Sequence, residues 1–186
     1  MLPIPAWSGL HPLVVHFPIA LLTVAPILMI VALLAKQERA FLTSALIVMA
    51  LGTAGAWLAV ATGEAAGHLV EGFPGAEPLL ERHEEMAESA RTLFTVLTLV
   101  FGALLAIPWA VKREPGRAVR LGSYGALLTV YAGALLYLAS TAHQGARLVH
   151  ERGVHALVAP GSSGLHAAEI ARLDSRHARA PAHHDD

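Results

Sequence analysis

Residues 12–35 read PLVVHFPIALLTVAPILMIVALLA, a run that contains no Asp, Glu, Lys or Arg. A helix needs about 20 apolar residues to cross a hydrocarbon core of about 30 Å, so this run is long enough to span a membrane. It lacks the basic leader of a secretory signal and is longer than the apolar core of such a signal, which has about 7–15 residues. The run therefore predicts a retained transmembrane helix.

Three further stretches have the same character, because residues 40–63, 92–111 and 121–146 also contain no Asp, Glu, Lys or Arg. Together with the first run they predict spans over residues 12–35, 40–61, 92–111 and 121–142. The composition agrees, since 55% of the chain is hydrophobic and only 15% is charged. We expect an all-α fold, an integral membrane four-helix bundle within residues 1–158, followed by an extramembrane tail over residues 159–186.

Basic residues set the expected orientation. The two short links, between the first and second spans and between the third and fourth, carry Lys36, Arg39, Lys112, Arg113, Arg117 and Arg120. Positive charge near the ends of spans stays in the cytoplasm. The other side receives the N-terminus, an acidic loop over residues 62–91 and the tail. Both termini are therefore expected on the non-cytoplasmic side.

Histidines gather on that same side. The chain has 11 histidines, and six of them lie at the outer ends of the predicted spans: His11, His16, His68, His83, His143 and His150. From the helical rise of about 1.5 Å per residue, His16 and His143 lie near the outer edge of the hydrocarbon. His83 and His150 share a level roughly 10 Å further out. His143 and His150 are seven residues apart, so they lie on one face of a continuous helix.

Facing imidazoles on neighbouring helices are typical ligands of b-type haem, because neutral imidazole binds iron and the bundle interior supplies an apolar slot. The heights favour one or two bis-histidine haems, with His16 and His143 as one axial pair and His83 and His150 as the other. Pairings that use His11 or His68 stay open. The chain has no cysteine, which excludes iron–sulfur clusters and attached c-type haem. Its net charge of -1 argues against a nucleic-acid partner.

Small residues recur at four-residue spacing on two of the predicted helices. Gly63 and Gly67 follow this spacing on the second helix, and Gly125, Thr129 and Gly133 follow it on the fourth. Such spacing lets membrane helices approach closely. We interpret both sets primarily as helix-packing positions.

Several motifs carry a family likeness. The run LHPLVVHFPIAL at residues 10–21, ATG at 61–63, His83-Glu84, and TAHQGARLVHERGV at 141–154 together resemble a bacterial membrane-protein family catalogued as domain of unknown function 2231. The resemblance covers roughly residues 9–158. Ala146 stands where the family usually has a second glycine, and the tail after Ala159 matches no part of the pattern.

The resemblance implies a place in membrane electron transfer. Members of the family are four-span proteins found beside, or fused to, domains typical of c-type cytochromes and periplasmic dehydrogenases. It also implies a location in the bacterial inner membrane, in contact with lipid and with other subunits of a redox complex. The family likeness is an association and assigns no chemistry by itself.

The leading hypothesis is a membrane-bound b-type cytochrome subunit. It would pass electrons between a periplasmic redox partner and the quinone pool or another carrier, as part of an oxidoreductase complex rather than as an enzyme alone. Quinone is a second expected cofactor, and no residues are assigned to it. Two alternatives stay open: a copper- or zinc-binding membrane protein, and a cofactor-free structural anchor subunit of a respiratory complex.

Overall fold

The computed structural model describes residues 7–68 and 76–152. The elements in this part of the chain are η1 (Trp7–Gly9), α1 (His11–Val14), α2 (His16–Leu34), α3 (Glu38–Gly67), α4 (Glu77–Ala110) and α5 (Arg117–Arg152). All of them are helical, and none of the described residues forms a strand. The predicted tail over residues 159–186 lies outside the described residues.

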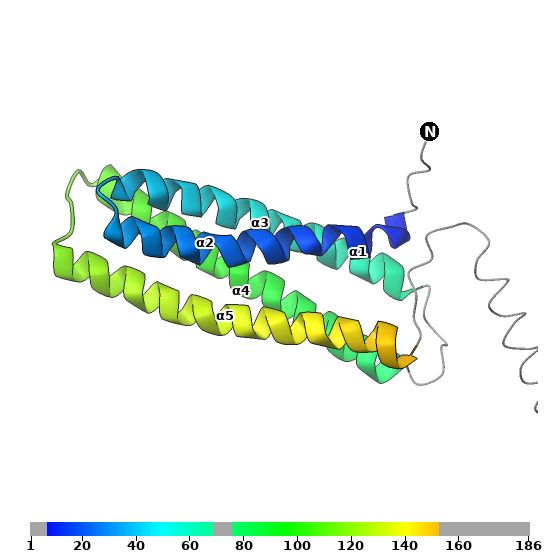
Figure 1. The fold of residues 1–186 in the computed structure, drawn as a ribbon. Coiled ribbons are helices and arrows are strands. Elements are labelled where there is room, and N and C mark those ends of the chain that lie inside the picture. The colour runs from blue at the N-terminus through cyan, green and yellow to red at the C-terminus, as the bar shows by residue number, and fades with distance from the viewer. Residues whose placement is uncertain (1–6, 69–75, 153–186) are drawn as a thin grey trace, which may run out of the picture.

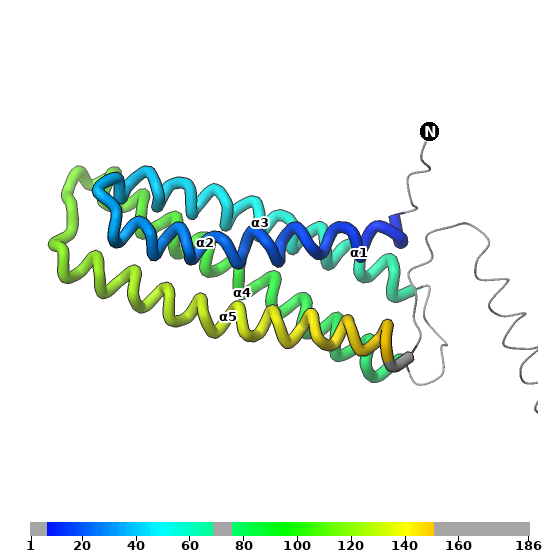
Figure 2. The backbone as a smooth tube through the Cα atoms, viewed as in Figure 1, coloured from blue at the N-terminus to red at the C-terminus, as the bar shows by residue number. Residues whose placement is uncertain are grey.

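The long helices form two antiparallel hairpins, α2 with α3 and α4 with α5, which pack side by side (Figure 1). Both short connections lie at one end of the bundle, here named the loop end, as the backbone trace also shows (Figure 2). The opposite end, here named the histidine end, holds α1, the last turns of α3 and α5, and the start of α4. Four helices are long and apolar enough to cross a membrane, which confirms the predicted all-α, four-span fold.

The helices extend beyond the predicted spans at the histidine end. The 34 residues of α4 make a helix about 50 Å long, whereas a hydrocarbon core is about 30 Å thick. The first turns of α4 contain Glu77, Glu81, Glu84, Glu85 and Glu88, so this part of the helix lies outside the apolar layer. α5 likewise continues to Arg152, past the end of its predicted span at residue 142.

The first predicted span is not one uninterrupted helix. α1 ends at Val14 and α2 begins at His16. Pro18 explains the break, because proline has no N–H to donate to the carbonyl of the residue four positions earlier, which is Val14. The next possible bond, from the Ile19 N–H to the Val15 carbonyl, is stretched to 3.4 Å. Val15 between them keeps a helical backbone, with φ -60° and ψ -28°, so α1 and α2 follow one helical path and only the hydrogen bonding is interrupted.

α4 ends at the loop end in a Schellman motif. The N–H of Lys112 donates to the Trp109 carbonyl at 3.3 Å, and the N–H of Arg113 donates to the Pro108 carbonyl at 3.1 Å. Lys112 adopts a φ of 53°, the left-handed conformation that this helix termination requires. Here a lysine takes a position that is usually glycine.

All four long helices contribute to the core, and each also presents apolar side chains outward. Fully or nearly fully buried positions recur every three or four residues along the helices: Leu22, Ala25, Met29, Leu42, Ala45, Met49, Phe94, Leu97, Phe101, Tyr124, Leu127 and Tyr131. Large apolar side chains such as Ile27, Leu99 and Leu136 are exposed on the outside of the bundle. A helix that is apolar on all sides is typical of a membrane span, where lipid covers the outer face.

A tyrosine completes the hydrogen bonding of a proline-containing helix. Pro26 lies inside α2 and has no N–H for the carbonyl of Leu22, four residues earlier. The hydroxyl of Tyr131, on α5, donates to that carbonyl at 2.8 Å. Because Tyr131 is fully buried, this bond joins the two hairpins at a depth where water cannot replace it.

The two sets of small residues have different surroundings. A Cβ added at Gly63 or Gly67 would lie against His11 or Glu84 respectively, so both glycines occupy crowded positions. Gly125 and Gly133 have no atom within 4 Å of such a Cβ, and Thr129 is exposed. The packing interpretation is therefore wrong for the α5 set within this chain, because those residues lie on the outer face of α5 and the core contacts of α5 use Tyr124, Leu127 and Tyr131 instead.

Candidate cofactor site

The imidazole of His11 is oriented by α3. Its Nδ1 donates to the carbonyl of Ala59 at 2.9 Å, and the hydroxyl of Thr62 lies 3.3 Å from the same nitrogen. A carbonyl oxygen can only accept, so the proton of the neutral ring is on Nδ1 and the lone pair is on Nε2. Thr62 is fully buried and donates to the backbone of α3, at the carbonyls of Leu58 and Ala59.

His83 is oriented in the same way by α5. Its Nδ1 donates to the carbonyl of Thr141 at 3.0 Å, which again leaves the lone pair on Nε2. The hydroxyl of Thr141 in turn donates to the Tyr137 carbonyl at 3.0 Å. Histidines that bind metals commonly donate their second ring N–H to a backbone carbonyl, because that bond fixes the tautomer and the direction of the ring.

The two oriented imidazoles lie close together between the hairpins, in an edge-to-face arrangement. The ring centroids of His11 and His83 lie 6.4 Å apart, with an interplanar angle of 79°. The rings come from α1 and α4, which belong to different hairpins, and their backbone acceptors come from α3 and α5. All four helical segments at the histidine end therefore contribute to one site.

A glycine lies against each ring. A Cβ added at Gly63 would stand 3.0 Å from Cε1 of His11, and one added at Gly145 would stand 2.9 Å from Cε1 of His83. At Gly145 the His83 ring or the helix would have to move, and at Gly63 the His11 ring would have to give by a few tenths of an ångström, so both positions are tight for any side chain. The site is therefore bounded by bare backbone on two sides, one on α3 and one on α5.

Burial favours the neutral form of His83. The ring is half-buried, and this desolvation lowers the pKa of His83 below its ordinary value, although the bond to the Thr141 carbonyl acts in the opposite direction. Because His83 precedes the apolar segment of α4 and has Glu81, Glu84 and Glu85 as near neighbours in sequence, it lies outside the hydrocarbon. A neutral imidazole is the form that binds a metal ion.

The structure places the other four predicted ligands differently. His16 is exposed, and its Nδ1 donates to the Pro12 carbonyl at 2.7 Å within its own helical segment. His143 and His150 are exposed on α5, which does continue through both, and His68 is exposed at the end of α3. The structure therefore brings together His11 and His83, one of the pairings left open, rather than His16 with His143 or His83 with His150.

Sequence reasoning missed the residues that orient the rings. The carbonyls of Ala59 and Thr141 carry no side-chain signal, so no motif could have revealed them. Gly63 was visible in a small-residue set and Gly145 in the family motif at residues 141–154, yet their contacts with His11 and His83 depend on how the helices face each other. Ala146 is exposed, so its difference from the family pattern leaves the contact of Gly145 intact.

The donor set is too small for a metal ion held by side chains alone. Across residues 7–68 and 76–152, no three His, Cys, Asp or Glu side chains are grouped closely enough to hold a metal ion. Two imidazoles suit a metal whose remaining ligands come from elsewhere, as in a haem, where the porphyrin supplies four nitrogens.

One comparison with known proteins gives a match. The model of a family described as "Predicted membrane protein (DUF2231)" matches residues 8–157, which include every helix of the bundle. No match was found among the curated proteins or among the solved structures.

Proposed function

The chain belongs to the DUF2231 family of predicted membrane proteins, and we propose that it is a b-type cytochrome whose haem is held by His11 and His83 at the histidine end. The observation that carries this proposal is the matched orientation of the two rings. Each donates its Nδ1 proton to a backbone carbonyl of a neighbouring helix, so each presents the lone pair of Nε2.

The spacing of the rings supports the same assignment. Two imidazoles that bind one metal ion from opposite sides, with metal–nitrogen bonds of about 2 Å, have ring centroids about 6 Å apart. The observed separation of His11 and His83 is 6.4 Å. Gly63 and Gly145 let the two rings lie against bare backbone, which limits how far each ring can turn. A bound haem supplies a one-electron couple at this end of the bundle.

The proposal specifies one haem per chain. His16, His143 and His150 are exposed and are not oriented toward a common partner by any bond found in the described residues. Of the one or two haems expected from the sequence, we therefore propose one. The protein would act as an electron-transfer subunit, with a periplasmic c-type cytochrome or dehydrogenase as one partner and quinone or another carrier as the second.

The orientation proposed for the chain places the haem on the periplasmic side of the bacterial inner membrane. The loop end carries the six basic residues of the two links, and such charge stays in the cytoplasm. The histidine end, with the glutamates of α4, then faces the periplasm. Both termini lie on that side.

The decisive experiment is a visible spectrum of the detergent-purified protein, oxidised and then reduced, with pyridine extraction to identify and count the haem. We expect a sharp reduced α band and about one haem b per chain, as a single bis-histidine pair requires. His11→Ala and His83→Ala should each remove the haem, whereas His16→Ala and His143→Ala, as matched controls, should retain it.

Other results would redirect the assignment. Haem lost from the His16 and His143 variants but kept in the His11 and His83 variants would restore the first pairing. Stoichiometric copper or zinc without a porphyrin spectrum would indicate a metal-ion protein. A blank spectrum from folded, haem-supplemented protein would favour the remaining alternative, a cofactor-free structural anchor subunit.

A further inference from the structure

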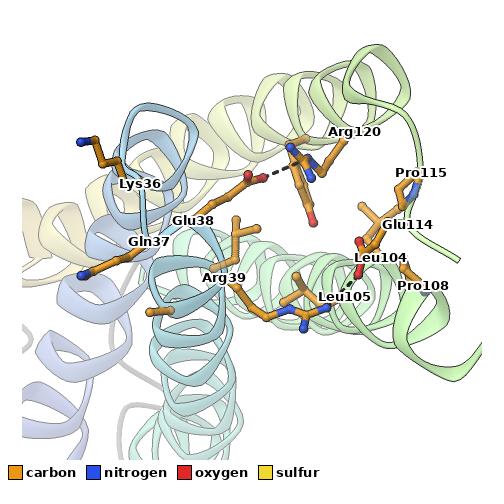
Figure 3. Close-up of a pocket in the computed structure, with 13 residues that line it drawn as sticks. Lys36, Gln37, Glu38, Arg39, Leu104, Leu105, Pro108, Glu114, Pro115 and Arg120 are labelled. Carbon is orange, nitrogen blue, oxygen red and sulfur yellow. Dashed lines mark hydrogen bonds and ion pairs between the residues drawn. The ribbon is translucent and has the colours of Figure 1, made fainter. Parts of the chain in front are cut away.

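A cavity lies at the loop end, about 380 Å³ in volume, far from the histidine site. It is a half-open cavity bounded by the start of α3, the last turns of α4 and the start of α5, so three of the four long helices form its wall (Figure 3). Along α4, Leu104 lies 21 residues from His83, which corresponds to about 30 Å. The cavity is therefore separate from the proposed haem site, and its occupant does not depend on that proposal.

Two ion pairs stand at the rim of the cavity. Arg39 Nη2 lies 2.9 Å from Glu114 Oε1, and Arg120 Nε lies 3.1 Å from Glu38 Oε1. Figure 3 shows both pairs around the cavity, whereas Lys36 and Gln37 point away from it. The rim facing the cavity thus has two positive and two negative groups and no net charge.

These charged groups have capacity for a further ligand. A guanidinium has five N–H donors and a carboxylate has about four acceptor positions, and each of the two ion pairs uses one of each. The Arg39–Glu114 pair is largely exposed, with side chains 73% and 62% accessible, so water competes for it and it holds its partners weakly. A ligand that carries both a phosphate and an ammonium group could satisfy both signs at once.

The inner wall is apolar. Leu42, Leu104, Leu105 and Pro108 line it below the charged rim, together with Tyr124. Pro108 also lacks the N–H that would otherwise bond to the Leu104 carbonyl, which leaves that acceptor on the cavity wall without its helical donor. The site thus combines a zwitterionic rim with an apolar interior at the depth where α4 leaves its apolar span.

The cavity continues toward the outside of the bundle. A second cavity of about 400 Å³ shares Arg39, Pro108 and Glu114 with the first and is lined further by Trp109 and Lys112. Trp109 is 73% exposed, as expected of a tryptophan at the interface between lipid and water. A molecule in the first cavity can therefore extend a chain along the apolar outer surface of α4, where Ile107 is also exposed.

We propose that this cavity binds the headgroup of an aminophospholipid of the phosphatidylethanolamine class. The phosphate accepts hydrogen bonds from Arg39 and Arg120, and the primary ammonium donates to Glu38 and Glu114. The acyl chains follow the apolar surface beside Trp109. Phosphatidylcholine is discriminated against because its quaternary ammonium has no N–H to donate, and phosphatidylglycerol because it has no positive group for the carboxylates.

The test measures which lipid the protein retains. Delipidated protein is incubated with an equimolar mixture of phosphatidylethanolamine, phosphatidylglycerol and phosphatidylcholine, and bound lipid is counted by native mass spectrometry. We expect preferential retention of phosphatidylethanolamine. Arg39→Gln and Arg120→Gln should each lower its retention about fivefold, since one basic group near the surface contributes about that much to binding an anionic headgroup. Arg113→Gln and Arg117→Gln remove the same charge from the same loop outside both cavities and should leave retention unchanged.

Glutamate variants give an effect of the opposite kind. Glu38→Gln and Glu114→Gln keep both arginines but remove the partners of the ammonium, so selectivity should shift toward phosphatidylglycerol. Each glutamate variant removes the same ion pair as one of the arginine variants but should change lipid selectivity differently, so a shared folding defect would not reproduce both results. Free phosphoethanolamine, which has the headgroup without acyl chains, should not displace the lipid.

Several outcomes would overturn the proposal. Equal retention of phosphatidylethanolamine and phosphatidylcholine would show that the carboxylates do not contact the headgroup. Preference of the unmodified protein for phosphatidylglycerol would indicate general attraction to basic charge. Displacement by free phosphoethanolamine would identify a site for a soluble zwitterion instead of a lipid.

Discussion

The imidazole of His11 lies 6.4 Å from that of His83, centroid to centroid, and each ring is held by a backbone carbonyl of a third or fourth helix. This relationship joins the two hairpins at the histidine end. The acceptor for His11 lies on α3 and the acceptor for His83 lies on α5, so helices of both hairpins hold the two rings.

Gly145→Ala should weaken the haem site without preventing insertion of the helices. The added Cβ would stand 2.9 Å from Cε1 of His83, which must move and lose its alignment with His11. Loss of such an orienting contact typically lowers metal affinity about tenfold or more. Haem content after purification, and the position of the reduced α band, measure the effect.

Gly133→Ala is the matched control for this substitution. It makes the same change on the same helix, at a position where the added Cβ meets no atom within 4 Å. Equal haem loss in both variants would show that the effect comes from α5 as a whole and would contradict a specific contact between Gly145 and His83.

The fold was predictable from sequence because the membrane sets a simple requirement. Four uncharged runs of about 20 residues specify four spans, whatever the details of packing. The extension of α4 beyond the apolar layer was also readable, from the helix-forming and charged residues that begin at Glu77. These features depend on composition along the chain and need no knowledge of which helix faces which.

The histidine pairing was not predictable in the same way. The height of a side chain relative to the membrane follows from its residue number. This estimate placed His83 outside the hydrocarbon, which agrees with its position before the apolar segment of α4. The direction of a ring depends on how its helix is rotated about its own axis, which the residue number alone does not give. Height alone therefore favoured His16, which the structure places on the outside of the bundle.

The hydrogen bond from Tyr131 to the Leu22 carbonyl should contribute measurably to the stability of the protein. Tyr131→Phe leaves a buried carbonyl without a donor, since Pro26 cannot supply one. The free energy of unfolding should fall by about 1–3 kcal/mol. Thermal or denaturant unfolding in detergent would report the loss, and Tyr137→Phe on the same helix is the control.

A second substitution distinguishes this explanation from a general packing effect. Pro26→Ala returns an N–H that can bond to Leu22, so Tyr131→Phe should cost less in that background. If the two substitutions are additive, the hydroxyl of Tyr131 does not serve as the replacement donor, and this interpretation of the Leu22 contact is wrong.

Stability of the haem-free protein should decrease as the pH falls below neutrality. Burial lowers the pKa of His83 in the folded protein below its ordinary value of about 6.5, so the unfolded chain binds a proton at a higher pH than the folded chain does. The contribution of His83 to stability is therefore fully present above the pKa of the unfolded chain, about 6.5. It is lost progressively as the pH falls from there through the pKa of His83 in the folded protein. Melting temperatures measured between neutral and mildly acidic pH would show the slope.

The partly buried rings of His11 and His83 should share this slope. His83→Gln removes one of the two rings and should make the slope smaller, and His150→Gln, which removes an exposed histidine, is the matched control. An unchanged slope in the His83 variant would assign the acid sensitivity to other groups.

The proposed orientation can be tested directly because the chain contains no cysteine. A single cysteine at Gly116, in the link at the loop end, should react with a membrane-impermeant maleimide only after the membrane is opened. A single cysteine at the exposed Glu81, on the outer part of α4, should react in intact cells freed of their outer membrane. The physical reason is the basic charge around Gly116, which resists translocation. Labelling of the Gly116 variant in intact cells, with protection of the Glu81 variant, would invert the topology. The His11–His83 site would then face the cytoplasm, and its redox partner would have to be sought there.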